Sequence, residues 1–191
     1  ARAVAEGFMA GGVLPVIKHI PGHGRATTDS HHELPVVTEP HAVLSATDFA
    51  VFRTLSDMPA AMTAHVVFTA LDAQAPASTS HSVTQKVIRG EIGFDGLLMS
   101  DDLSMKALSG NFGDQCRAVL AAGSDLALHC NGVLAEMEQV AEAAPSLTGD
   151  AARRFTAALA VLKQREPYDS ARAEQQLALA LATPGRDAES V

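Results

Sequence analysis

Histidines and acidic side chains gather in one segment near the start of the chain. Four of the eight histidines lie between positions 19 and 32, and Lys18, Asp29 and Glu33 lie in or beside the same stretch. An imidazole titrates near neutral pH, so a histidine beside a carboxylate can exchange a proton with a substrate. Acid/base chemistry is therefore one interpretation. Histidines that only satisfy the backbone of a long polar loop are the other.

Zinc coordination is a competing hypothesis for this segment. Four of its side chains are zinc-ligand types, namely His23, Asp29, His31 and His32. The segment has neither the HExxH spacing of a helical zinc site nor a cysteine nearby. The metal hypothesis then depends on composition alone, and we expect no metal and no other cofactor.

A second group of candidate residues follows an apolar run in the middle of the chain. Residues 96–100 read Gly-Leu-Leu-Met-Ser, and Asp101 and Asp102 follow directly. An aspartate at the end of a buried strand either caps the following helix or faces a pocket. Two consecutive aspartates allow both, with one residue in each role.

Four apolar runs predict the strands that position these residues. Each run is followed by a polar or glycine-containing loop and a helix-like segment, which is typical of parallel βα units. The predicted strands are 13–17, 60–67, 96–101 and 125–129. The predicted helices are 46–55, 82–92, 114–122 with Gly123 as C-cap, 134–143, 148–163 and 170–182, and the tail 183–191 is expected to fray.

The pattern predicts an α/β fold, a (β/α)8 TIM barrel of which this chain carries about the last four βα units. Ionisable residues follow the strands, at the edge where such barrels build their active sites. A whole barrel needs about 250 residues, so we expect the N-terminal half to be absent or supplied as a separate piece. Residues 1–165 would be the C-terminal half and residues 166–191 a helix and tail. A small doubly wound sheet is the alternative.

The segment from Val87 to Asp101 resembles the active-site motif of glycoside hydrolase family 3. In that motif two aliphatic residues, a basic residue, an acidic residue and a glycine precede an apolar strand that ends in Ser/Thr-Asp, and this sequence agrees at each defined position. The resemblance implies that Asp101, and not Asp102, is the nucleophile.

The loop KHIPGHGRATTDSHHELP resembles that of the bacterial β-N-acetylhexosaminidases of this family, the NagZ type. The resemblance implies that Lys18 and His19 bind the sugar and that His31 and Asp29 form the acid/base dyad. Ile20 departs from a commoner Phe and Arg25 from a frequent Asp.

A retaining mechanism without a cofactor follows from the resemblance. His31 would protonate the leaving oxygen while Asp101 attacks the anomeric carbon, and neutral His31 would then activate water. Asp29 would fix the imidazole tautomer, on a loop that closes after the substrate binds. His65 is expected either to line the same mouth or to be a buried structural histidine.

The implied substrate is terminal β-linked N-acetylglucosamine on peptidoglycan-recycling fragments such as GlcNAc-1,6-anhydroMurNAc, a muropeptide or amino-sugar disaccharide. Two alternatives remain open. One is a phosphorylase, because a histidine acid/base does not repel phosphate. The other is an inactive half-barrel binding fragment, because the family's sugar site also draws an Asp and an Arg from the N-terminal half.

Composition limits the partners. The net charge is -8, and no run of Lys or Arg forms a basic stripe, so we expect no nucleic-acid partner and no membrane surface. No apolar stretch is long enough for a membrane span, and Cys116 and Cys130 do not form a disulfide framework. We expect a cytoplasmic enzyme that is monomeric when full length.

Overall fold

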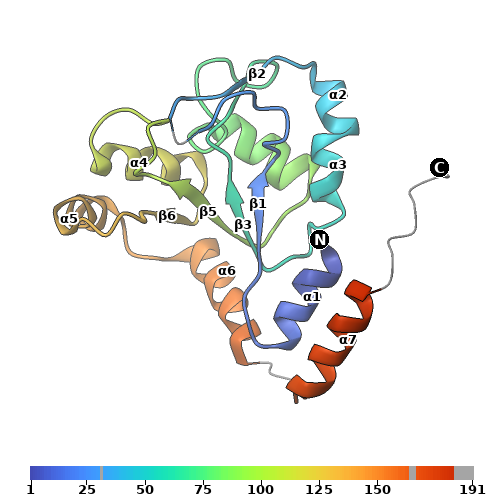
Figure 1. Ribbon diagram of the computed structural model, residues 1–191. Coiled ribbons are helices and arrows are strands. Elements are labelled where there is room, and N and C mark those ends of the chain that lie inside the picture. The colour runs from blue at the N-terminus through green and yellow to red at the C-terminus, as the bar shows by residue number, and fades with distance from the viewer. Residues whose placement is uncertain (31, 164–166, 183–191) are drawn as a thin grey trace.

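The computed structural model describes residues 1–30, 32–163 and 167–182 (Figure 1). Its centre is a parallel sheet in the order β1-β3-β5-β6, formed by Val16–Ile20, Ala60–Thr63, Leu97–Asp102 and Leu126–Leu128. The strands are ordered in space as they are along the chain, without the reversal that defines a doubly wound sheet. The predicted α/β fold with a parallel sheet is confirmed, and within the described residues the sheet does not close into a barrel.

Two strands differ from the apolar runs that predicted them. β1 begins three residues later than expected, after Pro15, which has no N–H to give to a sheet. The predicted strand 60–67 divides in two, because β3 ends at Thr63 and the short strand β4 (Val67–Phe68) pairs with β2 (Val36–Val37). Hydrophobicity shows that such a run is buried, but not where its pairing partner changes.

The helices agree more closely with the sequence. α5 (Leu134–Ala143) and α7 (Ser170–Ala182) have the predicted bounds. Gly123 ends α4 with a φ of 113°, as predicted for a C-cap. The remaining elements are α1 (Arg2–Ala10), α2 (His41–Ala46), α3 (Asp48–Arg53), the π-helix η1 (Val83–Glu91), α4 (Phe112–Ala122), α6 (Gly149–Ala160) and the 3₁₀ turn η2 (Val161–Lys163).

The helix predicted over 46–55 is present as the shorter α3, and the preceding α2 was not predicted. Thr47, whose ψ of -75° interrupts the helical backbone, separates the two. The prediction for residues 183–191 lies outside the described residues. Among the helices of the described part, none is long and apolar enough to cross a membrane.

One buried core joins the helices to the sheet. Phe49 of α3 and Ile88 of η1 are fully buried together with Ile20 and Leu98 of the strands. Burial of this apolar surface stabilises each strand against the helix that precedes or follows it. The paired aliphatic residues of the motif therefore anchor η1 beneath β5.

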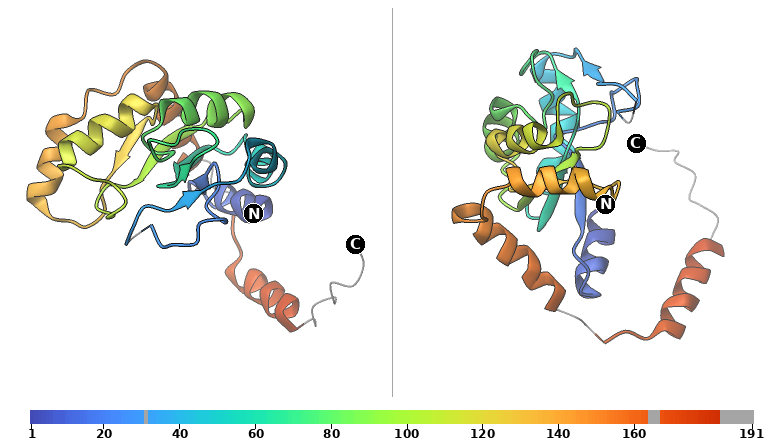
Figure 2. Two further views of the ribbon diagram at one scale, coloured as in Figure 1. Left: turned by 90° about the horizontal axis from the view of Figure 1, so that it is seen from above. Right: turned by 90° about the vertical axis from the view of Figure 1, so that its left-hand side faces the viewer.

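The two ends of the sheet differ. The arrows of β1 and β3 point toward the loops around β2, whereas α1 and α6 lie at the opposite end (Figure 1). α7 stands apart from the sheet in both views of Figure 2. The carboxyl ends of the strands, and the side chains that follow them, therefore share one edge.

Candidate active site

Asp101 and His19 lie together at the carboxyl edge of the sheet. The Nε2 atom of His19 is 3.8 Å from Oδ2 of Asp101, and the Asp101 side chain is only 9% exposed. The β1–β3 register shifts between Lys18 and Ile20, and the β5–β6 register shifts between Met99 and Asp102. Such irregularities re-aim side chains near a site. The fold therefore brings together His19 and Asp101, which were predicted as site residues from distant segments of the sequence.

The surroundings of His19 favour its neutral form. Burial lowers the pKa of His19, and the neighbouring charges of Lys18, His23 and His65 lower it further, whereas Asp101 acts in the opposite direction. A neutral imidazole can both donate and accept a hydrogen bond. His19 is therefore suited to bind a sugar hydroxyl beside the carboxylate.

Lys18 and His19 open onto a hollow of about 290 Å³. The loop after β1 and the helix α3 form its walls, through Gly22, His23, Gly24, Asp48, Val51 and Phe52. Gly22 has a φ of 154°, and a Cβ there would lie 3.1 Å from Cβ of Asp48. The two residues predicted to bind the sugar therefore line a cavity beside the carboxyl edge.

Asp102 holds a turn and does not cap a helix as expected, since the next helix, α4, begins at Phe112 and has Asn111 as its N-cap. Its Oδ1 accepts hydrogen bonds from the N–H groups of Ser104 and Cys130, both at 3.0 Å. Ser100 Oγ accepts another from Leu128 N. Burial acts to raise the pKa of Asp102, but the bonds from Ser104 and Cys130 lower it overall. Asp102 therefore holds the turn after β5 and joins it to the chain after β6.

The loop that carries the predicted acid/base dyad is only partly described. Asp29 is exposed, with Oδ2 4.0 Å from Nε2 of His32, and its carbonyl accepts from the N–H groups of His32 and Glu33. His31 lies outside the described residues. The His31/Asp29 dyad therefore stays a prediction.

Two further histidines belong to this region. The ring centroid of His23 lies 5.5 Å from that of His19, and its Nε2 is 3.2 Å from Oγ of Ser30. His65 is fully buried, so of the two expectations for it the buried structural one is correct. The histidine cluster near the start of the sequence already included His23. The burial of His65 could not be predicted, because no local pattern shows whether a histidine at a strand end points into the core. Within the described residues, no group of three or more His, Cys, Asp or Glu side chains is arranged to hold a metal ion.

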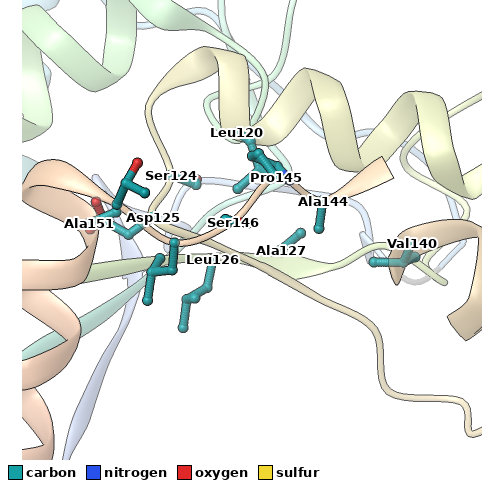
Figure 3. Close-up of a pocket in the computed structure, with 12 residues that line it drawn as sticks. Leu120, Ser124, Asp125, Leu126, Ala127, Val140, Ala144, Pro145, Ser146 and Ala151 are labelled. Atoms are coloured by element: carbon teal, nitrogen blue, oxygen red, sulfur yellow. The ribbon is translucent and has the colours of Figure 1, made fainter. Parts of the chain in front are cut away.

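A separate cavity lies at the opposite end of the sheet. It has a volume of about 330 Å³ and is lined by the start of β6, the end of α4 and the segment between α5 and α6 (Figure 3). Its walls are mainly aliphatic, and Asp125 is its one acidic side chain. None of the predicted site residues lines it, so the carboxyl edge remains the candidate site.

Comparison with known families gives one match that spans most of the chain. Residues 1–161 match the model of the glycosyl hydrolase family 3 N terminal domain. The chain is 42% identical to the Beta-hexosaminidase of Bordetella parapertussis over 135 residues, which are 69% of this chain and 38% of that protein. It is 40% identical to the Beta-hexosaminidase of Tolumonas auensis over 136 residues. The chain spans about two fifths of the length of these relatives.

Solved structures show the same likeness. NagZ from Neisseria gonorrhoeae in complex with N-trifluoroacetyl-D-glucosamine superposes with a TM-score of 0.77 at 32% identity, over 96% of this chain and 56% of that chain. The glycoside hydrolase family 3 beta-N-acetylglucosaminidase from Paenibacillus sp. str. FPU-7 superposes with a TM-score of 0.71 at 30% identity, over 87% of this chain and 35% of that one.

Proposed function

The chain belongs to glycosyl hydrolase family 3, as an N terminal domain of that family, and we propose that it supplies the nucleophile of a retaining β-N-acetylglucosaminidase. The observation that carries the proposal is the carboxylate of Asp101 at the end of β5, 3.8 Å from His19. The names of the relatives, Beta-hexosaminidase and beta-N-acetylglucosaminidase, support the choice of sugar.

Asp101 has the surroundings of a nucleophile. Its Oδ1 accepts the N–H of Asp102 at 2.9 Å, and its Oδ2 faces His19. In the first step Oδ2 forms a bond to the anomeric carbon, the glycosidic C–O bond breaks, and the leaving oxygen takes a proton from His31. In the second step water gives its proton to His31 while its oxygen displaces Asp101.

Lys18 and His19 hold the sugar in this scheme. Both line the hollow between the loop after β1 and α3, and His19 also lies 3.8 Å from Asp101. The imidazole and the ammonium group offer hydrogen bonds to sugar hydroxyl groups. Positioning of this kind can supply a large share of the rate enhancement. Asp29 would orient His31 and stabilise its imidazolium form.

The substrate we propose is terminal β-linked N-acetylglucosamine on peptidoglycan-recycling fragments, in the cytoplasm. The N-terminal half of the barrel, and with it the rest of the sugar site, would come from polypeptide other than these 191 residues. The open sheet and the partial coverage of the relatives support this division.

The test uses the full-length protein and 4-nitrophenyl N-acetyl-β-glucosaminide. Asp101→Asn should lower kcat by about 10⁴-fold, the scale seen when an essential catalytic group is lost. The matched variant Asp102→Asn should stay within about tenfold of wild type, because its carboxylate holds a turn. Equal losses in the two variants would contradict the assignment, and activity that survives Asp101→Asn would overturn the mechanism.

The same assay examines the dyad and the phosphorylase alternative. His31→Ala should slow the steps that need proton transfer by about 10²-fold to 10⁴-fold. NMR of the first product should show the β-anomer of free N-acetylglucosamine, with or without phosphate. A sugar 1-phosphate formed when phosphate is added would establish the phosphorylase instead.

A further inference from the structure

Both ring nitrogens of His65 have a partner. Its Nδ1 lies 2.6 Å from Oγ of Ser78, and its Nε2 lies 3.1 Å from the main-chain carbonyl oxygen of Asp102. His65 and Ser78 are both fully buried. The ring therefore joins the loop after β3 to the end of β5.

These partners determine the position of the ring proton. A carbonyl oxygen can only accept, so Nε2 of His65 must carry the proton and donate it to Asp102. In the neutral ring Nδ1 is then an acceptor, and the Ser78 hydroxyl donates to it. Burial lowers the pKa of His65, which agrees with a neutral ring, although Asp101 and Asp102 act to raise it.

The carbonyl that His65 holds belongs to the residue directly after Asp101. The β5–β6 register is irregular between Met99 and Asp102, and side chains replace part of the ladder there. The N–H of the same peptide, which belongs to Leu103, donates to the Leu128 carbonyl of β6 at 2.8 Å, so β6 holds the N–H side of this peptide and not its carbonyl. Besides His65, the Asp102 carbonyl accepts the N–H of Met105 at 3.2 Å, from within the same turn. The hydrogen bond from His65 therefore holds the Asp102 carbonyl from the loop after β3, the neighbouring strand.

We infer that neutral His65 is a positioning residue for the nucleophile, which holds the Asp101 carboxylate at the attacking distance through the Asp102 carbonyl. The inference rests on the proposed function. A displacement of about 1 Å at a reacting group can cost about 10²-fold in rate. We expect an effect of this size when the hydrogen bond from His65 to the Asp102 carbonyl is lost.

Two amide variants separate positioning from general stability. The amide nitrogen of His65→Gln can reach the place of Nε2 and donate to Asp102, whereas that of His65→Asn reaches only toward Ser78. In the full-length enzyme we expect His65→Asn to lower kcat about 100-fold with KM within about threefold. His65→Gln should recover at least about tenfold of that loss. The exposed His81→Gln is the matched control and should keep the wild-type kcat.

Thermal unfolding of the same variants provides the second comparison. A merely structural role predicts that kcat follows stability, so equal kcat values for His65→Asn and His65→Gln would overturn the inference. So would a His65→Asn variant within about threefold of wild type. A wild type that releases no nitrophenol would instead overturn the proposed function.

The ring proton is measured without any substrate. The ¹⁵N NMR signals of His65 in the wild type should show Nε2 protonated and the ring neutral at pH 7, because burial lowers the pKa of His65 below the usual value of about 6.5. Asp101, Asp102, His19 and His23 are the charged or titratable neighbours that act on it. A ring protonated on Nδ1, or on both nitrogens, at pH 7 would overturn the inference whatever the activity.

Discussion

At the residue scale, neighbouring residues of the motif that contains the proposed nucleophile have different roles. Asp101 faces the site, Asp102 holds the following turn, and Arg89 acts at the other end of the strand. Arg89 donates to the carbonyls of Phe94 and Gly96 and forms a 2.9 Å ion pair with Asp125. Burial lowers the pKa of Arg89, while Asp125 acts to raise it. The basic residue of the motif therefore fixes the start of β5, whose end presents Asp101.

Breaking this buried pair should cost far more stability than breaking an exposed one, because it leaves a buried charge without one of its partners. Arg89→Met leaves Asp125, which is 4% exposed at its side chain, with Arg154 as its remaining charged partner. We expect a loss of about 3 kcal/mol in the free energy of unfolding, the lower end for a broken buried pair. Arg117→Met, which breaks an exposed pair with Asp114, should change it by less than about 0.5 kcal/mol. Urea unfolding of both variants is the measurement, and similar midpoints would contradict the argument.

At the scale of elements, two glycines have different places in their helices, one at a C-terminus and one in the interior. Gly123 ends α4 in the left-handed region, and a Cβ there would lie 2.8 Å from Nε2 of Gln85 and 2.9 Å from Cγ2 of Thr84. Gly7 lies inside α1, and a Cβ there would meet nothing within 4 Å. The two positions therefore make opposite demands on the same substitution.

Gly123→Ala should destabilise the protein by about 1–3 kcal/mol, since both the backbone conformation and the space oppose a side chain. Gly7→Ala should stabilise it by about 0.5–1 kcal/mol, because alanine favours the helix and restricts the unfolded chain. Thermal unfolding of each variant against the wild type checks both signs. A stabilising Gly123→Ala would show that α4 does not need this C-cap.

At the scale of the whole molecule, the sheet has an open side beside β1. A groove of about 380 Å³ runs between α1, β1 and α3, and the apolar side chains along it are partly or largely exposed, among them Val4, Phe8, Val16 and Val51. An exposed apolar face next to an unpaired strand edge favours association with another chain.

We therefore expect the 191-residue chain alone to self-associate at concentrations on the order of 10 µM. Phe8→Lys should shift it toward the monomer, because a charge in the groove must be desolvated on association. Leu181→Lys on α7, which is as apolar and 78% exposed but outside the groove, is the control. Sedimentation velocity measures the outcome, and a wild-type chain that stays monomeric would contradict the expectation. The monomeric state of the full-length protein stays a prediction.

The candidate site was predicted only in part by the sequence. Asp101 at a strand end, and Lys18 and His19 near it, follow from local patterns of apolar runs and turns. Strand and turn patterns alone did not separate the roles of Asp101 and Asp102, because both are aspartates at a strand end; only the resemblance to the family motif singled out Asp101. The partners that distinguish them, Ser104, Cys130 and His19, include residues distant in the chain.

The sequence by itself determined the parallel βα pattern, the bounds of α5 and α7 and the C-cap at Gly123, because each depends on periodicity or backbone preference within a few residues. Only the tertiary structure decided where β3 ends, that His65 is buried and which of its nitrogens carries the proton. The end of β3 depends on the pairing of β4 with β2. The state of His65 depends on Ser78 and the Asp102 carbonyl, which the fold brings to it from 13 and 37 positions away. A hydrogen bond between distant segments leaves no period in the sequence, so it is decided only when the chain packs.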